Sequence, residues 1–572
     1  MTNKEIAEIF SQIADILDIK GENPFKIRAY QKAVRVIGGL SEEIRAIHER
    51  DGLREIDGIG VAIAKKIGEL VETGKLEYYE REKASIPEGL LSMLKVPDLG
   101  PKKVRALHEK LGIDTLQKLE EAARAGKLRQ LAGFGEKTEQ NILHGIELLK
   151  RGRERILLGT ATEVAETIVE ELSKLKEVSV AVAAGSLRRQ KETIGDIDIL
   201  VVSRDPKKVM DTFTNLDCVG EIVAKGGTKS SVRTHEDVQV DVRVVERKSF
   251  GAALQYFTGS QAHNVEVREI AVKRGLKVNE YGVFDVKSGK MVAGKTEEEV
   301  YAALDLPVIP PELREGMGEI DAARSGQLPD LLEPQQVRGD LHVHTRWSDG
   351  KHSIEEIVEA CRSLGYKYVG IADHSQSLNV ANGLTVEELE KQIELIRKVN
   401  RKLKGFRVLA GTEVDIMSDG SLDFPDELLA KLDFVVASIH SGFKQSREKL
   451  TDRIRSAMEN PHVSILGHPT GRLIGRRDPL DINVVEILEL AKETGTAVEL
   501  NAHHMRLDLN DVHLRKAKEL GVTISIGTDA HVMDELSSMR YGVATARRGW
   551  LEAKHVLNTL PASKLLKALK SK

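Results

Sequence analysis

The sequence predicts a multidomain α/β protein in which a helical N-terminal region precedes a mixed α+β core and a C-terminal α/β barrel of seven parallel strands. Three observations lead to this prediction. The chain has 572 residues, which is too long for one hydrophobic core. Helical segments punctuated by Gly fill residues 1 to about 150. After Arg338, short apolar strands alternate with helical stretches, as in a parallel sheet.

Composition restricts the class of protein. The chain is 41% apolar and 30% charged, and no apolar run approaches the length of a membrane span, so we expect a cytoplasmic protein that does not bind membranes. The net charge of -4 argues against a generally basic nucleic-acid binder. Cys218 and Cys361 are the only cysteines, so neither a disulfide framework nor a thiolate zinc site is expected. Metal ions must then be bound by His and carboxylate.

Three short Gly-containing segments of the helical region are similar to one another. They are residues 56–60, 96–100 and 131–135, and a helix with Lys near its start follows each. Each looks like the hairpin of a helix-hairpin-helix unit, in which Gly lets the backbone approach a DNA phosphate and the next helix offers free N–H groups. One such segment alone is more often an ordinary helix-helix turn. The candidate DNA contacts are Gly58, Gly60, Gly100, Lys102, Gly133 and Gly135.

Three aspartates in the mixed core form the first candidate metal centre. Asp196 and Asp198 lie two apart ahead of an apolar run, so on a strand they share one face. Asp241 lies on the polar face of an alternating strand over residues 238–244. Carboxylates within about 4 Å repel by roughly 1 to 4 kcal/mol per pair. A pair of Mg²⁺ ions, as in two-metal phosphoryl transfer, would remove that cost. The alternative is a hairpin with solvated aspartates.

A possible anion site lies upstream of these aspartates. Gly185 and Ser186 can turn backbone N–H groups and a hydroxyl toward triphosphate oxygens, and the charged guanidinium of Arg189 can donate paired hydrogen bonds to them. Further along, five of the fifteen prolines fall between Pro307 and Pro334 with little apolar periodicity, which predicts a linker or extended strap.

Residues of metal-ligand type end the short strands after Arg338, and the carboxyl ends of strands are where α/β barrels place functional groups. Imidazole and carboxylate without thiolate suit two or three Mn²⁺, Zn²⁺ or Fe²⁺ ions, and such a cluster is typical of phosphoester hydrolysis. A structural imidazole is the alternative for each single His. His352, His503 and His504 are left undecided between a structural role and a place beside the substrate. The candidate ligands are His342, His344, Asp349, His374, Glu413, His440, His468, Asp529 and His531.

Two sets of motifs now resemble known families. Gly185-Ser186-x-Arg188-Arg189, Gly195-Asp196-x-Asp198, Asp241 and residues 256–260 resemble the family X DNA polymerases, the group of DNA polymerase beta. Residues 338–572 resemble a polymerase-and-histidinol-phosphatase (PHP) domain. The order of the two is that of the bacterial and archaeal family X polymerases, and the resemblance covers essentially the whole chain.

The resemblance implies a role for each matching residue. Asp196 and Asp198 would hold both Mg²⁺ ions (or Mn²⁺), and Asp241 would act as ligand and as base toward the primer 3'-hydroxyl. The nucleotide site would comprise Gly185, Ser186, Arg189 and Gly195 at the triphosphate, Tyr256, Phe257 and Gly259 at the sugar, Asn264 at the minor-groove edge of the incoming nucleotide, and Arg268 at the template strand.

The resemblance also implies the domain boundaries. These are an 8-kDa-like helical domain (1–85), helix-hairpin-helix fingers (86–152), a nucleotidyltransferase palm (153–245), a thumb (246–316), a linker (317–337) and the PHP domain (338–572).

Some positions bear on side activities or depart from the family pattern. Lys66 matches the family's Schiff-base lysine for deoxyribose-phosphate lyase activity, and Lys26 matches a phosphate-binding lysine, whereas Ala62 and Tyr78 replace two others. Lys66 as a phosphate-contacting or solvated lysine is the favoured alternative. Gln190 and Gln261 stand where the family often has Gly and an acidic residue.

The leading hypothesis is a monomeric repair polymerase that fills short gaps in primed double-stranded DNA with deoxynucleoside triphosphates. Its PHP domain would act as a 3'-5' exonuclease, with abasic-site endonuclease or 3'-phosphatase activity as additions. The alternatives are a template-independent nucleotidyltransferase, a DNA-binding scaffold, and a PHP domain that acts as a small-molecule phosphatase. The sequence leaves open the PHP metals, the preferred lesion and gap size, the ribose discrimination, and how a 3' end moves between the two sites.

Overall fold

The computed structural model describes residues 1–96, 99–131, 133–151 and 155–570. Two compact units, Met1–Glu154 and Arg155–Lys572, are each considered by themselves. The predicted boundary at residue 152, and Pro97, Asp98 and Ala132 of two predicted hairpins, lie outside the described residues. In the described part of the chain, no helix is both long enough and apolar enough to cross a membrane.

The first unit is entirely helical, as predicted. Its first half packs five helices around Phe10, Ile13, Leu17 and Ile67, all fully buried. The helices are α1 (Asn3–Lys20), α2 (Pro24–Gly38), α3 (Ile44–Glu49), α4 (Val61–Thr73) and α5 (Glu77–Ala84). A Thr2 capping box begins α1, and Gly21 in the left-handed conformation ends it.

The second half of this unit forms a separate cluster around Met93, Val104, Leu107 and Leu119. Its helices are α6 (Gly89–Met93), α7 (Pro101–Leu111), α8 (Leu116–Arg124) and α9 (Glu136–Arg151). Buried Glu139 accepts hydrogen bonds from the backbone N–H groups of Leu128 and Arg129, and so joins α9 to the segment before the third hairpin.

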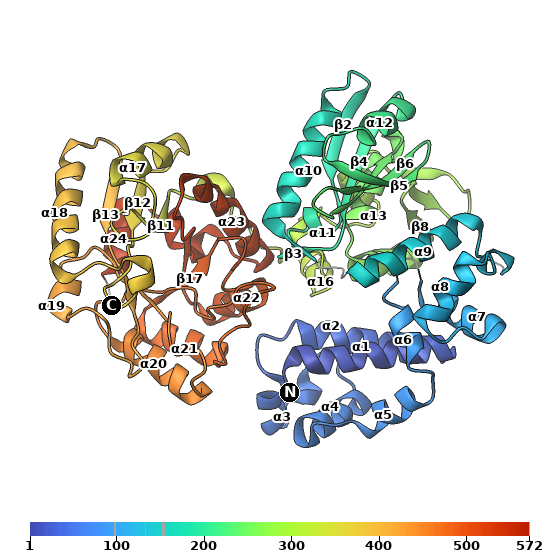
Figure 1. The fold of residues 1–572 in the computed structure, drawn as a ribbon, viewed down its shortest axis with the longest axis horizontal. Helices are drawn as coiled ribbons and strands as arrows, with labels where there is room; N and C mark the ends of the chain where they lie inside the picture. Colours follow the sequence, from blue (N-terminus) through green and yellow to red (C-terminus); the bar gives the residue numbers. More distant parts are fainter. Residues whose placement is uncertain (97–98, 132, 152–154, 571–572) are drawn as a thin grey trace. The chain divides into compact units, whose positions relative to one another are not determined.

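The second unit begins with the palm, whose sheet has the strand order β2-β4-β7-β6-β5. β4 (Ile197–Ser203) pairs antiparallel with β2 (Val178–Ala183) and parallel with β7 (Gln239–Val244). β5 (Val219–Lys225), β6 (Lys229–Thr234), α11 (Gly185–Arg188) and α12 (Pro206–Phe213) complete this region. Helix α10 (Leu158–Ser173) lies against the sheet (Figure 1), and β1 (Ile156–Leu157) pairs with β3 (Thr193–Ile194).

The thumb follows as three helices and a small antiparallel sheet. It comprises α13 (Phe250–Thr258), α14 (Gln261–Lys273), β8 (Leu276–Asn279), β9 (Gly282–Asp285), β10 (Met291–Ala293) and α15 (Glu297–Ala302). The expected linker is not an extended segment without secondary structure. Residues 317–337 include α16 (Glu319–Arg324), and Ile320, Ala323 and Leu331 are buried in the thumb cluster because this apolar face finds a partner there.

The C-terminal domain has parallel strands, which hydrogen bonding divides into two sheets. The first contains β11 (Gly339–Val343), β12 (Tyr368–Ile371) and β13 (Arg407–Ala410). The second contains β14 (Glu413–Asp415), β15 (Val436–Ser438), β16 (Ile465–Leu466), β17 (Ala497–Asn501) and β18 (Ile524–Gly527).

Isolated bridges join these two sheets. One links His374 with Glu413, and one links Val343, the last residue of β11, with Ala530, which follows β18. The first and last strands therefore lie side by side. A closed barrel with continuous hydrogen bonding between all neighbouring strands stays a prediction, since no strand pairing joins β13 to β14 among the described residues.

Helices cover the outside of these sheets, and Figure 1 shows α17 and α18 beside β11, β12 and β13. They are α17 (Ile354–Ser363), α18 (Val386–Lys402), α19 (Asp426–Leu429), α20 (Arg447–Glu459), α21 (Val484–Thr494), α22 (Asp511–Leu520) and α23 (Met539–Arg548). Helix α24 (Ala562–Leu569) instead packs through Leu565 and Leu569 on the opposite set of strand side chains, which includes Leu341 and Tyr368. Leu507 and Tyr541 are buried in the same hydrophobic cluster as the palm core, so palm and C-terminal domain share apolar surface.

Candidate active sites

The three palm aspartates lie together, as the sequence predicted. Asp198 on β4 and Asp241 on β7 are paired positions of two parallel strands, and Asp196 immediately precedes β4. Burial first, and then the charges of Asp196 and Asp241, raise the pKa of Asp198 to about 7. Lys229 Nζ lies 2.8 Å from Asp241 Oδ2. A cluster of this kind favours a divalent cation, because the cation removes the repulsion between carboxylates.

Gly185 allows the turn before this cluster to exist. Its φ of +62° is in the left-handed region, and a Cβ there would lie 2.5 Å from Asp198 Oδ2. The turn therefore packs directly on the carboxylate, so anion-binding backbone and acidic centre form one site.

A cavity of about 600 Å³ opens beside the aspartates. All nine residues expected at the nucleotide line this cavity: Gly185, Ser186, Arg189, Gly195, Tyr256, Phe257, Gly259, Asn264 and Arg268. Its other lining residues are Asp196, Asp198, Arg155, Lys191 and Gln261. Asp241 adjoins this set through its pairing with Asp198. Residues from the palm and from two thumb helices thus converge on one volume.

Neighbouring groups fix the orientation of the polar side chains in the cavity. Arg189 donates from Nε to Glu315 at 3.0 Å and from Nη1 to the carbonyl of Thr258 at 2.5 Å. Asn264 donates to the carbonyl of Tyr256 at 2.7 Å and accepts from Gln255 at 2.8 Å. Both side chains are held before any ligand arrives, which lowers the cost of ordering them on binding.

The hairpin glycines have the geometry that close phosphate approach needs. Gly60 and Gly100 are the N-caps of α4 and α7 and offer no side-chain cap, so the first N–H groups of both helices lack a side-chain acceptor from the cap. A Cβ added at Gly60, Gly100, Gly133 or Gly135 would meet no atom within 4 Å, whereas Gly58 has a φ of +91° and packs on Lys32. Four of these backbones therefore face open space.

Lys66 lies in a basic and aromatic cluster in the first unit. Its Nζ is 4.7 Å from the ring centre of Tyr78, and Lys26 Nζ is 5.7 Å from the same ring. Burial first, and then the charge of Lys26, lower the pKa of Lys66. A lysine with a lowered pKa is a better nucleophile at neutral pH.

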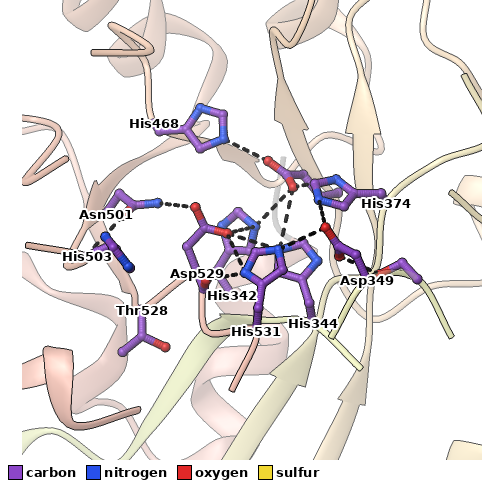
Figure 2. A network of polar contacts seen from close by, with 12 residues as sticks. His342, His344, Asp349, His374, His468, Asn501, His503, Thr528, Asp529 and His531 are labelled. Atoms are coloured by element: carbon purple, nitrogen blue, oxygen red, sulfur yellow. Dashed lines mark hydrogen bonds and ion pairs between the residues drawn. The ribbon is translucent and has the colours of Figure 1, made fainter. Parts of the chain in front are cut away.

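The second acidic centre lies where the strands of the C-terminal domain end. Figure 2 shows His342, His344, Asp349, His374, His468, Asp529 and His531 pointing toward one another. The structure brings all nine expected ligands into this cluster, in three overlapping groups. The first group is His344, Asp349, His374 and His531; the second is His342, His344 and Asp529; and the third is His374, Glu413 and His440. His468 contacts Glu413.

Glu413 is the centre of this cluster. One oxygen lies 2.9 Å from His468 Nε2 and 3.4 Å from His440 Nε2, and the other lies 2.9 Å from His374 Nδ1. Burial alone would raise its pKa, but His440, His342 and His374 lower the pKa well below the ordinary value. Glu413 is therefore ionised and can bridge two cations.

Asp529 occupies the opposite side. His344 Nε2 lies 3.1 Å from one of its oxygens, and Asn501 donates to the other at 3.1 Å (Figure 2). His531 Nε2 lies 3.3 Å from Asp349. Burial would raise the pKa of Asp529, but His344, His342 and Arg506 lower the pKa well below its usual range.

The donor set fits divalent metal ions. Nδ1 of His344 is buried without a hydrogen-bond partner among the described residues, and Nε2 of His342 and Oε2 of Glu413 have only ion-pair contacts with other members of the cluster. Buried polar atoms are seldom left unpaired unless a ligand or ion satisfies them. Imidazole and carboxylate without thiolate suit Mn²⁺, Zn²⁺ and Fe²⁺.

The partners that orient these ligands were not predicted from the sequence. Glu499 binds His342 Nδ1 at 2.6 Å, and Asp415 binds His440 Nδ1 at 2.9 Å. Arg506 lies 3.3 Å from Asp529, and its Nη1 is buried without a partner in the described part of the chain. The only available signal was position, since Glu499 lies on an apolar strand and Asp415 follows Glu413 by two.

Of the undecided histidines, two now have contacts. His503 Nε2 lies 3.7 Å from Glu535 beside the cluster. His504 packs on Gly159 of α10, where a Cβ would lie 1.8 Å from its Nδ1. His504 therefore belongs to the contact between the palm and the C-terminal domain.

Comparisons with known protein families agree with this organisation. Residues 1–76 match a helix-hairpin-helix domain, and residues 90–147 match a SAM-like helix-hairpin-helix tandem. Residues 155–252 and 253–315 match the DNA polymerase beta palm and thumb, and residues 340–503 match the PHP domain.

Similar proteins follow the same division. The DNA polymerase/3'-5' exonuclease PolX of Bacillus subtilis (strain 168) is 42% identical over 560 residues, covering 98% of this chain and 97% of that protein. A probable phosphatase of Thermoanaerobacter sp. (strain X514) is 31% identical over 246 residues, 41% of this chain and 94% of its own length. A probable phosphatase of Caldanaerobacter subterraneus is 32% identical over 206 residues, 34% of this chain and 76% of its own length.

Proposed function

Because the chain belongs to the family X DNA polymerases with a PHP domain, which include the DNA polymerase/3'-5' exonuclease PolX of Bacillus subtilis, we propose which residues carry out its two reactions. The chain is a DNA-directed DNA polymerase and a 3'-5' exonuclease, and its substrates are DNA and deoxynucleoside triphosphates. Palm and thumb perform synthesis. The PHP domain performs 3'-end degradation.

One observation supports the polymerase assignment above others: the expected nucleotide residues line one cavity beside Asp198 and Asp241. Ser186 and the backbone of Gly185 bind triphosphate oxygens, and Arg189 adds a charged contact. Tyr256, Phe257 and Gly259 form the wall for the sugar. Asn264, held by Tyr256, reads the minor-groove edge, and Arg268 contacts the template strand.

Asp196, Asp198 and Asp241 hold the metal ions of this site. Mg²⁺, or Mn²⁺ in its place, supplies neutralisation of phosphate charge and activation of the primer hydroxyl when bound. Asp241, whose Oδ2 lies 2.8 Å from Lys229 Nζ, accepts the proton of the 3'-hydroxyl.

For the exonuclease, two or three ions from the set Mn²⁺, Zn²⁺ and Fe²⁺ are held by the nine ligands around Glu413 and Asp529. When bound, such ions would activate a water molecule and neutralise the charge of the scissile phosphate. Arg506 lies 3.3 Å from Asp529, its Nη1 is buried without a hydrogen-bond partner among the described residues, and we assign its guanidinium to the phosphate of the departing nucleotide.

Backbone N–H groups of the N-terminal hairpins, rather than a positive net charge, bind the DNA. The open N-termini at Gly60 and Gly100, with Lys102, and the glycines at 133 and 135 bind duplex phosphates on the two sides of a gap. This favours short gaps in repair, and we place the reaction in a monomeric, cytoplasmic protein. The test is incorporation opposite each of the four template bases, on a one-nucleotide gap and on an open primer. Faster, template-directed filling of the gap supports the proposal, and addition independent of the template contradicts it.

A second activity is favoured by the lowered pKa of Lys66. Its unprotonated amine can attack C1' of a 5'-deoxyribose phosphate, while Lys26 binds the phosphate. The PHP domain also matches nearly the whole length of proteins named probable phosphatases, which favours 3'-phosphatase activity at the same metal site. Abasic-site endonuclease cleavage needs the same chemistry.

A further inference from the structure

Arg548, in the PHP domain, contacts the polymerase nucleotide site. It is the last residue of α23, and only 5% of its side chain is exposed. Its Nη1 donates to the backbone carbonyl of Arg189 at 2.7 Å and to Glu315 Oε1 at 3.0 Å. Its Nη2 donates to Asp511, also of the PHP domain, at 2.5 Å. Both terminal nitrogens of this guanidinium are therefore hydrogen-bonded, and they connect two domains of one compact unit.

Glu315 transmits this contact to the side chain of Arg189. The same oxygen, Oε1, accepts from Arg548 Nη1 and from Arg189 Nε, each at 3.0 Å. Burial disfavours ionised Glu315, but Lys191, Arg548 and Arg189 together lower its pKa. Without Arg548, Glu315 would lose one of the cations that keep it charged, and its hold on Arg189 would weaken.

The backbone contact constrains the same residue from its other end. The carbonyl of Arg189 follows α11, whose first residue is Gly185, and Gln190 next to it has a φ of +55°. Two residues further on, Glu192 pairs with Arg472 of the PHP domain at 2.7 Å. The turn that ends the triphosphate-binding segment is therefore held by two PHP arginines.

We infer that Arg548 is a positioning residue for nucleotide binding, and that the PHP domain thereby completes the polymerase's triphosphate pocket. Arg548 does not line the cavity, but Arg189 and Lys191 do. Arg548 acts through Arg189, whose guanidinium it holds in place via Glu315. The inference rests on the proposed role of Arg189 at the triphosphate.

A second arginine serves as a matched control for an adhesive role, in which Arg548 would only hold the two domains together. Arg540, on the same helix α23, pairs with Glu166 of the palm at 2.9 Å, and both side chains are exposed. Arg540 joins the same two domains without touching the cavity. An adhesive role predicts similar effects of both arginines, whereas positioning predicts an effect at Arg548 alone.

The experiment measures single-nucleotide gap filling by the full-length protein as dNTP concentration is varied. We expect Arg548→Ala to raise the KM for dNTP about tenfold while kcat changes less than about twofold. Arg548→Lys should recover part of the loss, and Arg540→Ala should keep the wild-type KM. The double variant Arg548→Ala/Glu315→Gln should add little to either single substitution, because both act on one contact. Exonuclease activity on single-stranded DNA reports that the PHP domain is folded.

The outcomes separate the inference from the proposal beneath it. An unchanged KM in Arg189→Ala would contradict the role of Arg189 itself. A raised KM in Arg189→Ala with a wild-type KM in Arg548→Ala overturns the inference alone. If Arg548→Ala does not fold, Arg548→Lys and Glu315→Gln decide: a KM raised in both supports positioning, and a wild-type KM in both overturns it.

Discussion

Asp198 and Asp241 occupy directly paired positions on the parallel strands β4 and β7, so Asp241 lies beside the carboxylate of Asp198, which lines the nucleotide cavity. The two residues are far apart in the sequence, and the pairing of the strands brings them together. The arrangement is unfavourable for the protein alone, as the raised pKa of Asp198 indicates, and favourable for cation binding.

This relationship predicts a pH-dependent stability. Since the pKa of Asp198 rises from 3.8 to about 7 on folding, its folded form retains a proton that the unfolded chain has lost between these values. The free energy of unfolding without divalent ions should therefore fall as pH rises through this window, by at most about 1.4 kcal/mol per pH unit from this group. Denaturant titration of wild type and Asp198→Asn measures the difference. An identical pH dependence in both proteins would refute the shift.

The open hairpin glycines predict a loss of DNA affinity without loss of stability. Gly60→Ala places a methyl group where the phosphate should approach, but it meets no protein atom within 4 Å. We expect gapped-DNA binding to weaken about three- to tenfold, and unfolding free energy to stay within about 0.5 kcal/mol of wild type. Gly38→Ala, equally open at the end of α2, is the control. Equal affinities for both variants would remove Gly60 from the DNA interface.

Lys66 predicts a covalent intermediate. Burial and the charge of Lys26 lower the pKa of Lys66 and so enlarge the fraction of unprotonated amine, and borohydride should therefore trap the protein on DNA that carries a 5'-deoxyribose phosphate. Lys66→Ala should abolish trapping, while the neighbouring exposed Lys65→Ala should retain it. Trapping that persists in Lys66→Ala would assign the amine elsewhere.

Arg506 predicts a defect confined to degradation. Removing its guanidinium from beside Asp529 should slow 3'-end hydrolysis about ten- to a hundredfold, because charged phosphate contacts are lost. Gap filling should continue at the wild-type rate. Arg476→Ala, exposed in the PHP domain, serves as the control. Wild-type hydrolysis by Arg506→Ala would leave this nitrogen without a role in the reaction.

Much of this organisation is readable from sequence because local patterns encode it. The alternation around Asp241 fixed its polar face, and metal-ligand residues at strand ends predicted the cluster around Glu413. Tertiary contacts were not readable. Glu499 and Asp415 orient histidines from other strands, and Arg548 reaches Arg189 across 359 positions. The segment at 317–337 looked like a strap because its few apolar residues, such as Ile320, reveal a partner only in the folded thumb.

The central claim is that two separate metal centres perform the two reactions. The most direct measurement follows extension and degradation of one labelled primer in a gapped duplex, with and without dNTP, in Asp241→Asn and His344→Ala. We expect Asp241→Asn to lose extension by about a thousandfold and keep degradation, and His344→Ala to do the reverse. Extension by Asp241→Asn, degradation by His344→Ala at the wild-type rate, or loss of both activities in either variant would contradict the claim.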